Sequence, residues 1–418
     1  MSDFIYMDNA ATTKVSPKVL EAMLPYFCEE YGNPSSTYRF SGRIAGKVLE
    51  ARSVIAQSVG AKESEIYFTG GGSESDNWAV KGVADALRAK GNHIITSSIE
   101  HHALLHTCEF LEKHGFEVTY LPVDEKGFVD PDELEKAIRP ETILISVMFA
   151  NNEIGTMEPV EKIGRIAHEH GIYFHTDAVQ AFGHVPINVD EMNIDLMSAS
   201  AHKLGGPKGI GLLYIRSGVK ISNLIHGGGQ EGGRRAGTTN AAGIIGFAKA
   251  VELSLQEMDS AGEHERKLRD RLISRVLEEI PYSRVNGDLT ERLSNNVSFC
   301  FRFIEGESLL ILLDQKGICA SSGSACTSGS LDPSHVLLAL GLPHEIAHGS
   351  LRLTLSADNT VEEVDKVVDS LKEIVGRLRA MSPLYEDFIK REREPITACG
   401  NGIRPDHVRY KQRFIEEK

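Results

Sequence analysis

The residues best suited to chemistry lie in the stretch Ser200-Ala201-His202-Lys203, which leads into Leu204-Gly205-Gly206. The lysine follows a short apolar run, with hydroxyl groups before it and glycines after it. A lysine held in this way can form a Schiff base with a carbonyl cofactor such as pyridoxal phosphate, and the serines and His202 can donate hydrogen bonds to a phosphate. A lone lysine is usually solvated, so this interpretation depends on residues elsewhere in the chain.

A carboxylate precedes Lys203 at the predicted end of another strand, in Tyr173-Phe174-His175-Thr176-Asp177. A carboxylate that pairs with a pyridine nitrogen keeps it protonated, and a protonated ring is the electron sink that pyridoxal chemistry needs. An aspartate at a strand end is more often a cap or turn residue. With Lys203 downstream, we predict that Asp177 faces the cofactor.

A phosphate site is predicted where the strand 65–69 runs into Gly70-Gly71-Gly72-Ser73 and a helix through Val83. Unpaired backbone N–H groups and the positive end of the helix face the same point in this arrangement. The loop is not a Walker motif, because no Gly-Lys-Ser/Thr follows.

Strands alternate with helices through the first half of the chain, which predicts an α/β domain with a mostly parallel sheet. Ligands of such sheets lie beyond the carboxyl ends of the strands. The polar residues Ser73, His101, Asn152, Asp177 and Lys203 all fall at such ends. The predicted strands are 93–97, 117–121, 143–149, 172–175, 195–198 and 211–215, and the predicted helices between them are 103–113, 131–138 and 159–170.

A second, smaller α+β domain is predicted after a helix-rich stretch at about 240–279, and we expect the N-terminal segment to pack with it. Its strands are 296–303, 317–320 and 350–355, and its terminal helix is 361–380. We predict a large domain at 14–260, a small domain from 1–13 and 261–385, and an extension at 386–418. The Gly-rich, charged tail beyond Pro395 is predicted to be unfolded or loosely docked.

Taken together, five motifs resemble those of the pyridoxal-phosphate-dependent cysteine desulfurases of the NifS and IscS type, in the class V branch of the fold-type I enzymes. The resemblance covers roughly residues 5 to 385 and implies a large domain with a mostly parallel seven-stranded sheet plus a smaller α+β domain. The motifs are Asp177 with Gln180, Ser200 to Lys203, Glu100-His101, Asn151 to Gly155, and Ser321 to Thr327.

The resemblance implies a role for each matching residue. Lys203 would hold pyridoxal 5'-phosphate covalently and move the substrate Cα proton, and His101 would stack on the ring and assist proton transfer. The other implied cofactor-binding residues are Gly72, Ser73, Asn152, Asp177 at the pyridine nitrogen, Gln180 at the phenolic oxygen, Ser200, His202, and Thr238 from a partner subunit. The implied substrate-carboxylate residues are Arg352, Asn152 and Asn33.

Cys326 is the residue that would define the reaction. The resemblance implies that its thiolate attacks the sulfur of the bound cysteine, which gives L-alanine and a persulfide on Cys326. It also implies a homodimer and an iron–sulfur scaffold protein of the NifU or IscU type as sulfur acceptor, and it allows transient cluster ligation by Cys326 with that scaffold. We expect residues after Met381 and the tail to influence partner choice. The remaining cysteines, Cys28, Cys108, Cys300 and Cys319, are predicted to be small buried hydrophobes, whereas Cys399 has no assigned role.

Composition excludes several other classes. A net charge of −14 over 418 residues disfavours general nucleic-acid binding, and no apolar segment is long enough to cross a membrane. No signal peptide is evident, so we expect a cytoplasmic protein with reduced cysteines. His344-Glu345-Ile346-Ala347-His348 matches a zinc-protease motif, but Pro343 and Gly349 confine it to about one helical turn, so no metal site is predicted.

Two rival functions remain open. One is another reaction of the same cofactor, namely a transaminase, a selenocysteine lyase or a cysteine sulfinate desulfinase, all of which share Lys203 and Asp177. The other is a binding or scaffold role without catalysis, which the presence of both Lys203 and Cys326 disfavours. General and nitrogenase iron–sulfur assembly are equally compatible with the resemblance.

Overall fold

The strands expected between residues 65 and 215 form one seven-stranded sheet in the computed structural model, which describes residues 4–322 and 333–393. The strand order is β2-β8-β7-β6-β5-β3-β4, and β8 alone runs antiparallel to its two neighbours. The mostly parallel sheet is therefore confirmed. Its strands are β2 Ile66–Thr69, β3 His93–Ser97, β4 Glu117–Leu121, β5 Thr142–Ser146, β6 Tyr173–Asp177, β7 Leu196–Ser200 and β8 Gly211–Ile215.

Helices cover both faces of this sheet. Successive strand residues point to opposite faces, and the residues on each face are buried under helices. Leu144 belongs to the core on the side of α4 and α5, and its neighbour Ile145 belongs to the core on the side of α3 and α7. The near-continuous apolar strands of the sequence follow from this double coverage. The helices of this half are α1 Pro17–Met23, α2 Pro25–Cys28, α3 Arg39–Ser58, α4 Gly72–Leu87, α5 His102–Glu112, α6 Pro131–Ala137 and α7 Val160–Glu169.

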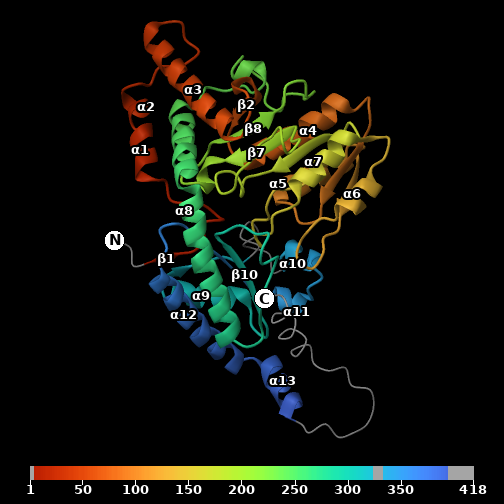
Figure 1. The fold of residues 1–418 in the computed structure, drawn as a ribbon, viewed down its shortest axis with the longest axis vertical. Helices are drawn as coiled ribbons and strands as arrows, with labels where there is room; N and C mark the ends of the chain where they lie inside the picture. Colours follow the sequence, from red (N-terminus) through yellow and green to blue (C-terminus); the bar gives the residue numbers. More distant parts are fainter. Residues whose placement is uncertain (1–3, 323–332, 394–418) are drawn as a thin grey trace.

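The helix-rich stretch is a single helix of 39 residues, α8 Ala241–Glu279, capped by the Asn240 side chain, which accepts from the Gly243 N–H at 3.0 Å. Its first half contributes Phe247 to the core beneath the large sheet, and its second half contributes Leu272 to a separate core. Figure 1 shows α8 running lengthwise past the large sheet and down to the smaller sheet region.

The second core surrounds a three-stranded antiparallel sheet in the order β12-β10-β9. The N-terminal segment packs here, as expected, because β1 pairs with β11 and both Ile5 and Met7 are buried in this core. The elements are β1 Ile5–Tyr6, β9 Ser283–Val285, β10 Asn296–Phe301, α9 Gly306–Asp314, β11 Ile318–Cys319, α10 His335–Ala339, α11 His344–Ala347, β12 Ser350–Thr354, α12 Val361–Ala380 and α13 Pro383–Arg393.

The predicted boundaries at 260 and 386 both fall within continuous helices, α8 and α13. The division into 14–260, 1–13 with 261–385, and 386–418 stays a prediction. The tail beyond residue 393 lies outside the described residues.

Among the cysteines, Cys108 and Cys300 are fully buried, as predicted, and Cys319 is half-buried. The prediction for Cys28 is wrong: this side chain is exposed, because α2 is one turn long and buries none of its residues. Cys326 lies outside the described residues.

Candidate active site

Two of the predicted site residues, Asp177 and Lys203, lie at the same edge of the large sheet. Asp177 is the last residue of β6, and the neighbouring strand β7 ends at Ser200. A 3-10 turn, η2 Ala201–Lys203, follows β7 directly and carries Lys203. Since parallel strands bring their carboxyl ends to one edge, these residues converge as the alternating pattern predicts.

Lys203 is half-buried beneath the N-terminal segment. Its Nζ donates to the backbone carbonyl oxygen of Ala10 and, at 2.9 Å, to that of Ala11. The Gln180 amide donates to the same Ala10 oxygen at 3.1 Å. Residues far apart in the sequence thus share one acceptor, and the segment around Ala10 covers the lysine.

Asp177 is 6% exposed, and its carboxylate accepts from the Val179 N–H at 2.9 Å. Burial raises its pKa, while the nearby Lys203 charge opposes that rise. A second buried carboxyl group, Asp76 of α4, has a pKa raised well above its usual value by burial and by the charge of Asp177. Both effects favour the protonated form of Asp76, which leaves the negative charge on Asp177.

His101 is the N-cap residue of α5, where its Nδ1 accepts from the Ala103 N–H at 3.2 Å. That hydrogen bond selects the neutral tautomer with the proton on Nε2. Burial first, and then the positive charge of Lys203, lower its pKa to about 4. His101 therefore presents a neutral ring near Lys203 at physiological pH.

A cavity of about 440 Å³ lies at the start of α4. The first turn of a helix has N–H groups without intrahelical acceptors, and here they adjoin the buried Ser200 and the half-buried His202. The Nδ1 atom of His202 lies 3.1 Å from the Thr12 hydroxyl oxygen. A Cβ at Gly72 would lie 2.6 Å from Val179, so the close approach requires glycine. The lining residues are Thr12, Gly70, Gly71, Gly72, Ser73, Glu74, Ser200, His202, Lys208 and Gly209.

This lining fits a phosphate group. It combines backbone N–H donors, hydroxyl groups and a lysine, which are the groups that bind phosphate in proteins. Burial and the charges of Lys203 and Lys208 lower the pKa of His202 to about 4, so its ring is neutral. The carboxylate in the lining, Glu74, is neutralised by a bidentate ion pair with Arg235 at 2.8 and 3.0 Å.

Arg352 of β12 is 2% exposed and contacts the same N-terminal segment that covers Lys203. Its guanidinium donates to Asp8 Oδ1 at 2.9 Å and to the backbone oxygen of Asn152 at 3.1 Å. Its buried Nε has no hydrogen-bond partner among the described residues. A buried guanidinium with an unpaired donor suits a carboxylate ligand.

Two predicted site residues, Asn33 and Thr238, lie outside the group of site residues that contact one another within one chain. Asn33 is exposed in the turn between α2 and α3, where its side chain accepts from the Ser35 N–H at 3.0 Å. Thr238 is exposed in the coil before α8. Within residues 4–322 and 333–393, no hydrogen bond links either side chain to Lys203 or to the cavity.

Cys326 lies outside the described residues, but both flanks of its segment are described. Ser321 pairs with Arg352 through two backbone hydrogen bonds of 2.6 and 3.2 Å. On the other flank, the Ser334 hydroxyl donates to the buried Glu153 carboxylate, next to Asn152. The described residues on both flanks therefore lie beside the predicted substrate-carboxylate residues Arg352 and Asn152.

Sequence reasoning missed the partners that hold these residues. Asp8, which pairs with Arg352, and Thr12, which contacts His202, come from the N-terminal segment, for which the sequence predicts only packing with the smaller domain. The protonated Asp76 was also missed. The one available signal was the density of small polar residues between Asp8 and Thr13.

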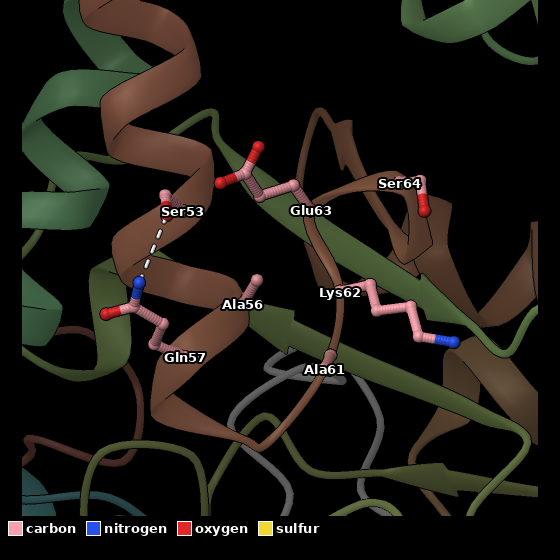
Figure 2. Close-up of a pocket in the computed structure, with 7 residues that line it drawn as sticks. All are labelled: Ser53, Ala56, Gln57, Ala61, Lys62, Glu63 and Ser64. Atoms are coloured by element: carbon pink, nitrogen blue, oxygen red, sulfur yellow. Dashed lines mark hydrogen bonds between the residues drawn. The ribbon is translucent and has the colours of Figure 1, made fainter.

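A second hollow, of about 410 Å³, lies between the end of α3 and the turn that follows it, and Figure 2 shows its lining. Gln57 donates to the Ser53 hydroxyl there at 3.2 Å, and Lys62 lies on the following loop. None of the predicted site residues lines this hollow. The described residues also include no group of three side chains placed to ligate a metal and no helix suited to span a membrane.

The chain belongs to the class-V aminotransferase family, whose model matches residues 5–367. It is 58% identical over 396 residues to a protein of Clostridium botulinum (strain Hall) named cysteine desulfurase IscS, with 94% of this chain and 100% of that protein covered. It is 61% identical over 380 residues to the protein of the same name from Methanosarcina thermophila, with 91% and 94% covered.

Solved structures agree with this assignment. One described as a NifS-like protein matches with a TM-score of 0.84 at 41% identity and covers 89% of this chain and 99% of its own. Another, described as SspA in complex with cysteine, matches with a TM-score of 0.75 at 39% identity, with 85% and 99% covered. Enzymes of this class depend on pyridoxal phosphate, and the cavity lining described above fits that cofactor's phosphate.

Proposed function

We propose that this protein is a pyridoxal-phosphate-dependent cysteine desulfurase, which converts L-cysteine to L-alanine and supplies the sulfur for iron–sulfur cluster assembly. The observation that carries the proposal is that one N-terminal segment joins Lys203 to Arg352, because Ala10 accepts from Lys203 and Asp8 pairs with Arg352. Asp177 lies near Lys203, and both flanks of the Cys326 segment lie beside Arg352 and Asn152. Relatives at 58% and 61% identity carry the name cysteine desulfurase.

The chain's residues fit each part of the cofactor. Lys203 would hold it covalently, Asp177 would pair with the pyridine nitrogen because its buried carboxylate retains the negative charge, and Gln180 would pair with the phenolic oxygen. His101 and Asn152 would contact the ring. Bound there, the cofactor supplies an electron sink for the substrate Cα. The phosphate would be held by Gly72, Ser73, Ser200 and His202, with Thr238 of a second subunit.

Three groups act on the substrate. Arg352 binds its carboxylate as a bidentate pair, assisted by Asn152 and Asn33. Lys203 would be the base that takes the proton from Cα. The neutral ring of His101 takes part in proton transfer near the same atoms, since its pKa of about 4 keeps it from holding a fixed charge at neutral pH.

Cys326 accepts the sulfur. Its thiolate attacks the substrate Sγ, a sulfur–sulfur bond forms, and the substrate Cβ–Sγ bond breaks. The electron pair of that bond remains with the substrate carbon skeleton, and a proton added at Cβ completes the methyl group of alanine. The persulfide on Cys326 is the product that carries sulfur onward.

We propose a homodimer as the working form. Six large apolar side chains are exposed within residues 20–49, which is an unusual density for a surface that meets only water. A second copy would cover them and bring its Thr238 to the phosphate. These side chains are Leu20, Leu24, Phe27, Tyr31, Tyr38 and Leu49.

The acceptor of the persulfide is proposed to be an iron–sulfur scaffold protein of the NifU or IscU type, with transient ligation of the cluster by Cys326. The extension after Met381 is proposed to affect partner choice. A cytoplasmic location is supported by the free state of Cys28, Cys108, Cys300 and Cys319, because paired cysteines characterise oxidising compartments.

The proposed function is tested with the purified wild-type protein. We expect the visible absorbance of a lysine-bound pyridoxal cofactor and, on addition of L-cysteine with a thiol reductant, equal amounts of alanine and sulfide. Pyruvate or an amino-group acceptor requirement in place of alanine would instead support a lyase or transaminase. A protein that carries no cofactor after incubation with pyridoxal phosphate would contradict the proposal.

Replacement of Arg352 by lysine should raise KM for L-cysteine about tenfold or more with a smaller change in kcat, because lysine cannot make the planar two-bond contact with a carboxylate. The matched control is Arg271→Lys, which breaks an exposed bidentate pair with Asp365. Steady-state alanine formation measures both variants. An unchanged KM in Arg352→Lys, with wild-type thermal stability, would remove Arg352 from the substrate site.

A further inference from the structure

The coil between β8 and α8 carries Thr238, and its residues 226–239 are here called the Gly-rich segment. Most of its residues are exposed, and several of its glycines have positive φ values. Such a sequence has a high conformational entropy when it is unrestrained. The segment is nevertheless fixed to the large domain by two bidentate ion pairs.

The first pair joins Glu231 to Arg52 of α3. The guanidinium donates to both carboxylate oxygens at 2.8 Å, and Glu231 also accepts from the Phe68 N–H at 2.9 Å. The side chains are only 16% and 7% exposed. Arg52 lies over the Phe68 ring at 4.6 Å from its centroid, so the pair is held on three sides.

Glu231 adopts a left-handed backbone conformation, with φ of 48°. This conformation is unfavourable for a residue with a side chain and persists where surrounding contacts impose it. The three hydrogen bonds to the carboxylate are those contacts. The ion pair and the backbone hydrogen bonds of the turn at Glu231–Gly233 together hold the Gly-rich segment in this conformation.

The second pair joins the segment to the phosphate cavity. Arg235 binds Glu74 of α4 through two hydrogen bonds, and Glu74 also accepts from the Gly70 N–H at 2.7 Å. The fixed points at Glu231 and Arg235 lie just before Thr238, which is itself exposed. An exposed coil with two such anchors is ordered for contact with another molecule.

Arg52 follows the exposed Leu49 by one turn of α3, so the anchored coil lies next to one of the exposed apolar side chains of residues 20–49. We infer that the Arg52–Glu231 pair is a positioning device that presents the Gly-rich segment to a second copy of this chain, so that each pair serves the cofactor site of the other subunit. This inference rests on the proposed dimer and adds residues that act across it.

The alternative is a pair that only stabilises its own subunit by joining α3 to β2. Mixed dimers distinguish the two. We combine a Glu231→Gln subunit, whose Lys203 is intact, with a Lys203→Ala subunit, whose Gly-rich segment is intact, using two affinity tags. Activity and the rate constant of cofactor release are measured for the mixed dimer and for both parent dimers.

We expect the Glu231→Gln homodimer to release pyridoxal phosphate about tenfold faster than wild type, because a partly buried charge-assisted contact is lost. Glu133→Gln, which removes the exposed Glu133–Lys136 pair, should release it at the wild-type rate. In the mixed dimer, the site with intact Lys203 receives an intact segment from its partner. It should recover half of the wild-type activity and the slow release.

Three results would overturn the inference: a mixed dimer as impaired as the Glu231→Gln homodimer, release from that homodimer at the control rate, or a wild-type protein that is monomeric by light scattering. The last would also refute the proposed dimer, whereas the first two would leave it standing. If Glu231→Gln proves unfolded by thermal denaturation, Arg52→Lys replaces it, because lysine keeps the charge and loses the two-bond geometry.

Discussion

A Lys203→Ala protein is expected to fold and to lose cysteine turnover by about 10³-fold or more, together with the visible band of covalently bound cofactor. Two functions disappear with one amine: the covalent hold on pyridoxal phosphate and the base that moves the Cα proton. The loss should not unfold the domain, because the side chain is half-buried and its hydrogen bonds are to the backbone oxygens of Ala10 and Ala11.

The matched control is Lys62→Ala, since Lys62 is an exposed lysine of the same domain in the hollow of Figure 2. It should retain both the absorbance and the turnover of the wild type. Absorbance spectroscopy, alanine formation and thermal denaturation are measured on both variants. Turnover at the wild-type level in Lys203→Ala would mean that another amine carries the cofactor.

The second large effect is expected for Cys326→Ser, which should separate the two halves of the reaction. A hydroxyl group is far less nucleophilic than a thiolate at neutral pH, so alanine and sulfide formation should fall at least ~100-fold. Lys203, Asp177 and Arg352 are unchanged, so addition of L-cysteine should still alter the cofactor spectrum. The variant therefore binds its substrate and stops before sulfur transfer.

Cys28→Ser provides the control, because Cys28 is an exposed thiol on α2 and should be dispensable. Trapping of the persulfide with an alkylating reagent, followed by mass spectrometry of the labelled peptide, locates the sulfur. Wild-type alanine formation in Cys326→Ser would rule out the persulfide mechanism and favour the lyase or transaminase alternative.

The site was predictable from sequence where local pattern decides position. Asp177 and Lys203 each follow an apolar strand, and parallel pairing of those strands is sufficient to bring them to one edge. Arg352 was identified by resemblance, but its partner Asp8 is 344 positions away, and no local pattern encodes a contact between two chain segments so far apart.

Other features depend on tertiary packing. The sequence of the charged middle of α8 is compatible with several helices or with one. The helix is continuous because each of its halves is buried in one of the two cores. Cysteine is a residue type that is often buried, yet the one-turn helix that carries Cys28 packs too little surface to bury it. The raised pKa of Asp76 follows from its burial and from its nearness to Asp177, which only the folded arrangement reveals.

The continuity of α8 has a mechanical consequence for catalysis. Lys203 belongs to the large sheet region and Arg352 to the small one, and α8 is shared by both cores. A helix advances about 1.5 Å and turns about 100° for each residue, so it resists torsion where a coil of equal length would swivel. One residue inserted between Val251 and Leu268 would turn the buried faces of its two halves out of phase. The number of residues in α8 therefore sets how the two cores are oriented, and with it the distance between the Lys203 amine and the Arg352 guanidinium.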